Sequence, residues 1–314
     1  MHYLACLVIE LICLYILWLS NSAYNTFLVL FRHYVTSLCL VLFATIIYNN
    51  RGLTDYMHFV IFSKRYLVVI ACILVLAMIL SFNIYGTPIS AVYLGENIRL
   101  VPIYNVDTED KKVAISFDSA WGADKTKSIV DMVKENNINA TFFLVGFWVE
   151  DYPDMVKYIN DNGLEIGTHS NTHPDMTTLS ASNMHNELAT SISLIENIIG
   201  EGKVKLFRAP YGAYNNSLLN MASNDFGLKT IQWNIDTLDW KGISGTEICN
   251  RVMKKLCPGS IILCHNNSDH ILDALPLIIA SVKNAGYDIV SVGELIMQDN
   301  YYIDSLGIQR HKVD

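Results

Sequence analysis

The stretch KVAISFDS (112–119) sets the pattern for most of the chain. Its apolar, β-type run at 112–117 leads directly into Asp118 and Ser119, so we expect a buried strand followed by polar side chains. Six further runs of this type lie at 140–145, 164–167, 203–207, 228–234, 260–264 and 287–290. Segments with helical spacing separate them, for example 184–199. This alternation predicts an α/β fold with a parallel sheet, either closed into a barrel or open and doubly wound.

Ionisable residues stand where five of these seven strands end. In parallel α/β folds, ligand chemistry gathers at the carboxyl ends of the strands. The residues at these ends are Asp118, His169 with His173, Arg208, Asp236 and His265. Random placement would rarely produce this arrangement. We therefore expect one shared site at this rim of the sheet.

His169 and His173 are four residues apart, so their imidazoles would face the same way if a helical turn began there. Together they could bind one divalent cation, with zinc as the first choice. Two histidines at this spacing are by themselves a weak signal, because two packing or surface histidines would look the same.

The remaining residues at this rim suit acid–base chemistry. Asp118 could accept a proton from water, with Arg208 orienting its carboxylate, or it could serve as a helix cap or a structural ion pair. His265 suits a general acid because the ordinary pKa of histidine is about 6.5. Asp236 could keep His265 protonated and fix its tautomer. As a set, these residues predict hydrolysis at a carbonyl by a metal-held water.

Five motifs occur in order along the chain: SFDSAWG (116–122), HSNTHP (169–174), RAPYG (208–212), DTLDW (236–240) and LCH (263–265). They resemble the motifs of the NodB-type polysaccharide deacetylases, carbohydrate esterase family 4, over about 111–298. The resemblance implies a distorted barrel of about seven β/α units that removes N-acetyl groups from peptidoglycan or a chitin-like glycan. The first motif looks like that of the sporulation-associated Gram-positive branch.

The resemblance also implies a role for each residue at the metal and the base. His169 and His173 would bind a divalent metal, zinc first, with cobalt or nickel as alternatives. Asp118 would be the catalytic base, and Arg208 would steer its carboxylate.

On the side of the leaving group, the resemblance implies that Asp236 tunes His265, the catalytic acid. The backbone N–H of Tyr211 would help to stabilise the oxyanion. Trp240 and Leu263 would pack the acetyl pocket, although both could equally be core residues.

Ser119 departs from the family pattern, which has a second, metal-binding aspartate at this position. A hydroxyl is a poorer ligand than a carboxylate, so the metal should be held weakly, unless Asp124 in the next loop swings in. Two functions follow as alternatives. The chain is a deacetylase, or it is a catalytically inactive protein of the same fold that binds glycan or assists envelope assembly. An esterase that removes O-acetyl groups is a third, weaker reading.

Composition divides the chain into two parts. Of its 314 residues, 52% are hydrophobic and only 17% are charged, and the mean hydropathy is +0.29. Residues 1–90 carry a net charge of +2, and since the whole chain carries −8, residues 91–314 carry −10. This acidic balance argues against a nucleic-acid partner, which requires clustered lysine and arginine.

The apolar part predicts a membrane region over 1–85, with about three transmembrane helices at 3–19, 27–48 and 66–85. Basic residues gather at 49–65, which should therefore be cytoplasmic. We therefore expect a multi-pass protein of the plasma membrane with an extracellular catalytic domain. Its expected partners are lipid and an N-acetylated glycan. The predicted boundaries are a connector at 86–110, the deacetylase domain at 111–298 and a C-terminal tail at 299–314. No protein partner is indicated.

Overall fold

The computed structural model of the protein describes residues 99–312, which belong to one compact unit. The three predicted membrane spans, 3–19, 27–48 and 66–85, lie outside the described residues. Within 99–312, every helix is too short or too polar to cross a lipid bilayer.

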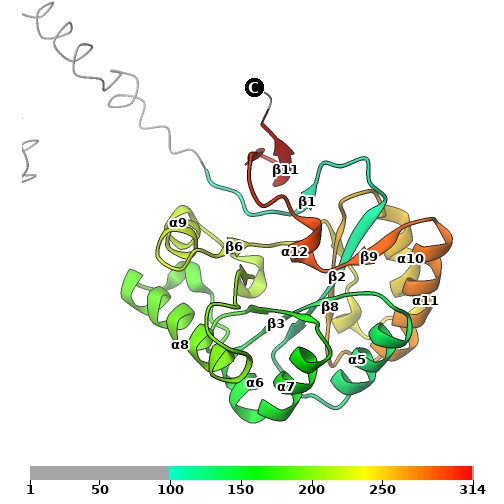
Figure 1. Ribbon diagram of the computed structural model, residues 1–314, viewed down its shortest axis with the longest axis horizontal. Helices are drawn as coiled ribbons and strands as arrows, with labels where there is room; N and C mark the ends of the chain where they lie inside the picture. The colour runs from blue at the N-terminus through cyan, green and yellow to red at the C-terminus, as the bar shows by residue number, and fades with distance from the viewer. Residues whose placement is uncertain (1–98, 313–314) are drawn as a thin grey trace, which may run out of the picture. The chain divides into compact units, whose positions relative to one another are not determined.

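A parallel sheet forms the centre of the unit, with the strand order β6-β5-β4-β3-β2-β8-β7, and β9 pairs with the start of β2. The strands are β2 (Lys112–Ser119), β3 (Thr141–Leu144), β4 (Glu165–Thr168), β5 (Leu206–Phe207), β6 (Lys229–Thr230), β7 (Ile235–Asp236), β8 (Ile261–His265) and β9 (Asp288–Val290). Figure 1 shows the sheet curled into a half-barrel. This architecture agrees with the distorted barrel implied by the resemblance.

β2 is the central strand of this sheet, and it is buried from Val113 to Ser119. Near-continuous apolar strands are typical of parallel sheets that are covered on both faces. β3 pairs with β2 on one side and β8 on the other. In this register Asp118 stands directly beside His265, so the fold itself brings these two residues together.

Helices cover the outer face of the curled sheet (Figure 1). They are α5 (Thr126–Glu135), α6 (Gly146–Asp151), α7 (Pro153–Asp161), α8 (Ala181–Ile199), α9 (Asn216–Asn224), α10 (Gly245–Lys255), α11 (Ile271–Asn284) and the short α12 (Val292–Leu295). α8 contains the predicted helix 184–199, and it buries Met184, Leu188 and Ile195 on one face. Its N-terminus is capped by Ser180, whose hydroxyl accepts a hydrogen bond from the backbone N–H of Asn183.

Within the predicted strand 228–234, Lys229–Thr230 forms β6, and β7 begins just beyond it, at Ile235. Between them the chain turns to other partners: Ile231 forms a bridge with Ile103, and the carbonyl of Gln232 accepts a hydrogen bond from Arg208. The side chain of Asn234 then accepts the backbone N–H of Ile261. The prediction of one continuous strand was wrong, because these partners, which are distant in sequence, contact the residues after Thr230 and interrupt the ladder.

A second, three-stranded sheet joins the two ends of the described chain. It consists of β1 (Asn105–Val106), β11 (Ile308–His311) and β10 (Tyr301–Ile303), in that order. The fully buried side chain of Gln309 accepts the backbone N–H of Met297 and donates to its carbonyl, both at 2.8 Å. The compact unit therefore extends beyond 111–298 on both sides, into the predicted connector and tail.

Candidate active site

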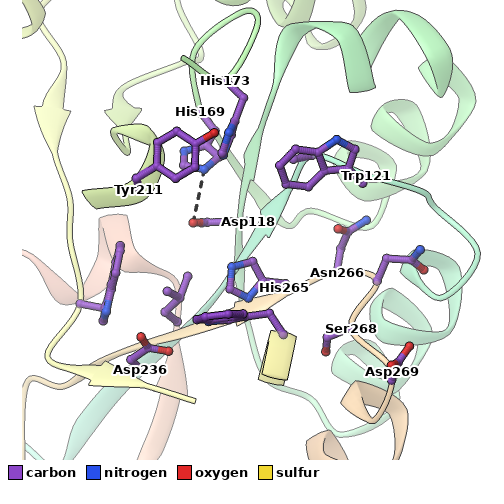
Figure 2. Close-up of a pocket in the computed structure, with 15 residues that line it drawn as sticks. Asp118, Trp121, His169, His173, Tyr211, Asp236, His265, Asn266, Ser268 and Asp269 are labelled. Carbon is purple, nitrogen blue, oxygen red and sulfur yellow. Dashed lines mark ion pairs between the residues drawn. The ribbon is translucent and has the colours of Figure 1, made fainter. Parts of the chain in front are cut away.

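A pocket of about 690 Å³ opens at the carboxyl ends of the central strands. Its lining contains most of the predicted site residues, namely Asp118, His169, His173, Tyr211, Asp236, Trp240, Leu263 and His265. Figure 2 shows Asp118 near the middle, with the two histidines and Tyr211 on one side and His265 on the other. Arg208 lies behind the pocket wall, since its side chain is completely buried. The expected convergence at one rim is confirmed.

Asp118 is held by Arg208. One guanidinium nitrogen of Arg208, Nη1, donates to Oδ1 of Asp118 at 2.7 Å, and Nη2 donates to the hydroxyl of Ser116 at 2.9 Å. The guanidinium also stacks over the ring of Phe143, 4.1 Å from its centroid. These contacts fix the carboxylate, as predicted, and leave its second oxygen facing His169.

Arg208 also sets the charge of this carboxyl group. Burial by itself would raise the pKa of Asp118, but the positive charge of Arg208 outweighs it and holds the pKa below its usual value. Asp118 is therefore ionised at neutral pH, which is the state that a general base requires.

His265 is held by Asp239. Its Nδ1 lies 2.7 Å from Oδ1 of Asp239, and its backbone N–H donates to Oδ2 at 2.8 Å. Burial would lower the pKa of His265, but the hydrogen bond and the negative charge of Asp239 outweigh it and raise the pKa above its usual value. The Nδ1 proton is thus fixed toward Asp239, and the protonated form of the ring is stabilised.

Asp236 was predicted to fill this role, and the structure gives it to Asp239 instead. Leu238 between them has a left-handed backbone, with φ 54° and ψ 28°, and the chain turns there. Oδ1 of Asp236 accepts the N–H of Leu238 at 2.8 Å, so this carboxylate caps the turn while Asp239 points inward. Asp236 lines the pocket but does not contact His265 by a hydrogen bond.

His169 is presented as a neutral ligand. Its Nδ1 lies 2.7 Å from the carbonyl oxygen of Arg208, and since a carbonyl only accepts, Nδ1 carries the proton. The unprotonated Nε2 then lies 3.5 Å from Oδ2 of Asp118. Burial lowers the pKa of His169, so this tautomer remains uncharged at neutral pH. The lone pair of Nε2, next to the carboxylate of Asp118, could therefore bind a cation.

His173 completes the pair, with its ring centroid 4.9 Å from that of His169. Burial lowers the pKa of His173 to about 4. Its Nδ1 is buried and has no hydrogen-bond partner in the described residues. Both imidazoles are therefore neutral and can serve as ligands.

The helical turn that would align these histidines is absent, and a tight loop brings them together. Ser170 and His173 have left-handed backbones, with φ 70° and 58°. Glu187 on α8 clamps the loop, because one of its oxygens accepts the N–H groups of Asn171 and Thr172 at 2.8 Å. Sequence reasoning missed Glu187, since a helical glutamate far from every motif carries no signal of this contact.

Ser119 does not complete a metal site. Its side chain is fully buried and does not line the pocket, as expected for the neighbour of Asp118 on a strand, where successive side chains point to opposite faces. Asp124, the suggested substitute, is exposed and lies outside the lining. In the described residues, no group of three or more His, Cys, Asp or Glu side chains could hold a metal ion. Two of the three implied ligands fit a cation, and the third does not.

The other predicted residues form the walls of the pocket. Leu263 is buried, whereas Tyr211 and Trp240 are exposed by 69% and 59%. Tyr211 has a left-handed backbone, with φ 58°. Trp121, from the first motif, is 64% exposed and contacts His173 edge-on. Large apolar rings exposed at a pocket mouth are suited to bind a ligand.

Comparison with known proteins matches residues 105–231 to the family described as polysaccharide deacetylase. The chain is 34% identical over 185 residues to a peptidoglycan-N-acetylglucosamine deacetylase of Bacillus cereus, covering 58% of this chain and 66% of that protein. It is 29% identical to the peptidoglycan-N-acetylmuramic acid deacetylase PdaA of Bacillus subtilis, covering 65% and 78%. It is 31% identical to the uncharacterized protein YlxY of Bacillus subtilis, covering 64% of this chain but only 62% of YlxY.

Solved structures agree with these matches. BA3943 of Bacillus anthracis, described as a CE4 family pseudoenzyme, superposes with a TM-score of 0.61 and 33% identity, covering 68% of this chain and 73% of that one. A BA3943 mutant described as having restored enzymatic activity has a TM-score of 0.60 and 36% identity, covering 62% and 71%. The fold, the order of the motifs and these similarities together show that the chain belongs to the polysaccharide deacetylase family.

Proposed function

We propose that the protein removes N-acetyl groups from a cell-wall glycan by hydrolysis. The observation that carries this proposal is the pairing of Asp118 and His265 on adjacent strands at one pocket. Each has its own fixed partner, Arg208 for the carboxylate and Asp239 for the imidazole. One residue is thereby kept ionised and the other is biased toward the protonated form, as a base and an acid at one site require.

In the proposed reaction, Asp118 takes a proton from a water molecule, and the water oxygen attacks the carbonyl carbon of the acetamide. The backbone N–H of Tyr211 stabilises the resulting oxyanion. His265 then donates its proton to the sugar nitrogen as the C–N bond breaks, so that acetate and a free amine leave. Trp240 and Leu263 enclose the methyl group.

His169 and His173 would hold a divalent cation, for which zinc is the first choice. When bound, it would polarise the carbonyl group and lower the pKa of the attacking water. Because Ser119 supplies no ligand in the pocket, binding should be weak. Cobalt and nickel are the alternatives.

We also propose that the domain works outside the plasma membrane, anchored by the spans at 3–19, 27–48 and 66–85. The apolar composition of these segments and the basic residues at 49–65 support this placement. Cell-wall glycan is then within reach of the pocket.

The full chain, purified in detergent, tests the proposed activity. We expect it to release acetate from N-acetylglucosamine oligomers in the presence of zinc, cobalt or nickel, and His265→Ala to release far less. No release above that of His265→Ala with any of the three metals would overturn the proposal.

Ser119 favours a second candidate, in which the protein binds glycan without turning it over. The similarity to BA3943 supports it, since that protein is described as a pseudoenzyme. This candidate predicts binding of N-acetylated oligomers without acetate release. Release that depends on His265 would exclude it.

A further inference from the structure

The side chains that line the pocket include more negatively than positively charged groups. The lining includes the carboxylates of Asp118, Asp236 and Asp269 but no lysine or arginine. Asp118 is neutralised by its ion pair with Arg208. His265, whose protonated ring carries a positive charge, is likewise paired with Asp239. Asp236 and Asp269 form no ion pair with a described residue, so they place two uncompensated negative charges at the pocket.

These two carboxylates lie on the side of the catalytic acid. Figure 2 shows Asp236 and Asp269 on either side of His265, away from the pair of His169 and His173. Asp236 is half-buried, with one oxygen bound to the N–H of Leu238, and Asp269 is exposed.

The nearby cations are directed elsewhere. Nζ of Lys125 donates to the backbone oxygen of Ser268 at 2.7 Å and to those of Asn267 and Asp269 at 3.4 Å. Lys241 lies over the ring of Trp240, 5.0 Å from its centroid. Nη2 of Arg251 donates to the backbone oxygen of Asp236 at 3.4 Å. None of these three side chains is in the lining, and none forms an ion pair with the carboxylate of Asp236 or Asp269.

The uncharged part of the lining suits a neutral sugar. Trp121 and Trp240 expose apolar rings on which a pyranose ring can stack. Asn267 adds an amide group, and the two carboxylates accept hydrogen bonds from hydroxyl groups. An ionised carboxylate is an acceptor only, so it cannot pair with a second carboxylate on the ligand.

We propose that the pocket selects a neutral sugar of the N-acetylglucosamine type and rejects N-acetylmuramic acid with a free lactyl carboxylate, because Asp236 and Asp269 repel that group. This inference rests on the proposed deacetylase function. Two unit charges facing a third across a solvated pocket would lower affinity on the order of tenfold. Salt should weaken the discrimination, since the pocket is open to solvent.

Three tetrasaccharide probes separate charge from bulk, with the full chain in detergent. The first is chitotetraose. The second is a peptide-free alternating tetrasaccharide of N-acetylglucosamine and N-acetylmuramic acid with free lactyl carboxylates, and in the third these carboxylates are converted to uncharged methylamides. Equilibrium binding is measured for each at low and high salt without added metal, because a divalent cation at His169 and His173 would offset the charge of the two carboxylates. Mass spectrometry then identifies which sugar loses its acetyl group.

We expect the methylamide probe to bind about tenfold more tightly than the free acid at low salt, and acetyl loss to fall on N-acetylglucosamine. In the double variant Asp236→Asn and Asp269→Asn, this ratio should fall to about twofold, because the carboxamides keep the shape and remove the charge. Asp225→Asn, at an exposed position outside the lining, is the matched control and should keep the full ratio.

Equal affinity for the free acid and the methylamide, or a ratio unchanged in the double variant, would overturn the inference. Acetyl loss from N-acetylmuramic acid at the same rate as from N-acetylglucosamine would also overturn it. If the wild type releases no acetate, the proposed activity is contradicted. The binding ratio of the wild type and the double variant is measured independently of turnover, so it still tests the inference.

Discussion

At the scale of single residues, Asp239 is the most fully engaged group of the site. Its Oδ1 binds Nδ1 of His265, and its Oδ2 accepts both the backbone N–H of His265 and the hydroxyl of Ser268, the latter at 2.9 Å. The side chain is completely buried. A buried carboxylate with every oxygen occupied is held in one position, and it holds the imidazole in turn.

Substitution Asp239→Asn should lower the rate of acetate release about 100-fold, because the acid loses the charge that keeps it protonated. The wild-type rate should fall as the pH rises through the raised pKa of His265, since only the protonated ring donates. In the variant that pKa falls, so the alkaline limb of the pH–rate profile moves to lower pH.

Asp236→Asn is the matched control for this experiment and should move the alkaline limb less, because Asp236 raises the pKa of His265 by its charge alone, without a hydrogen bond. A limb that moves with Asp236→Asn and stays unchanged with Asp239→Asn would contradict the assignment.

The two aspartates show how far residue identity could be predicted from sequence. The motif DTLDW offers two carboxylates three positions apart, and nothing in the spacing says which one reaches His265. The left-handed turn at Leu238 decides it. By contrast, Asp118 and His265 follow runs that are plainly strand-like, so their place at one rim could be predicted.

At the scale of elements, the loop from β4 to α8 carries the two histidines, and α8 holds that loop. Besides the two backbone N–H groups, Glu187 accepts the hydroxyl of Thr172 at 2.6 Å. The hydroxyl of Ser170 accepts the N–H of His173 at 3.0 Å. The histidine pair thus depends on a helix that contributes no side chain to the pocket lining.

Removing this clamp with Glu187→Ala should lower the free energy of unfolding by about 1–3 kcal/mol, since the loop N–H groups lose a charged acceptor. Acetate release should fall about tenfold, because the histidines are no longer held in register. Glu187→Gln keeps one acceptor oxygen and should show a smaller loss in both measurements. Activity unchanged in Glu187→Ala would contradict the role of the clamp.

Element boundaries could be predicted where hydrophobic runs are long, and not where polar contacts divide them. The runs at 112–117, 140–145 and 260–264 became β2, β3 and β8. The run 228–234 did not form one strand, because Gln232 accepts a hydrogen bond from Arg208 and Ile231 pairs with Ile103. Such long-range partners leave no mark in local periodicity.

At the scale of the whole molecule, the second sheet closes the described unit. Arg310 on β11 forms ion pairs with Asp107, just after β1, and with Asp304. The pairing of β1 with β11 is parallel, and it joins residues about 200 positions apart. The strands of the C-terminal tail are too short and polar for sequence periodicity to predict them.

Substitution Gln309→Ala should lower the free energy of unfolding by about 2 kcal/mol, because the backbone N–H and carbonyl of Met297 lose their shared partner. Chemical denaturation of the full chain measures this change. His311→Ala, at an exposed position of the same strand, is the control and should stay within about 0.5 kcal/mol of the wild type. Equal stability of the two variants would contradict the stabilising role of the Gln309 side chain.

The central claim, that water is activated by Asp118 and adds to an acetamide in this pocket, is tested most directly in water enriched in ¹⁸O. The full chain, supplied with zinc and an N-acetylglucosamine oligomer, should release acetate that carries one labelled oxygen. Asp118→Asn should release almost none. Wild-type protein that yields no more labelled acetate than Asp118→Asn would contradict the account.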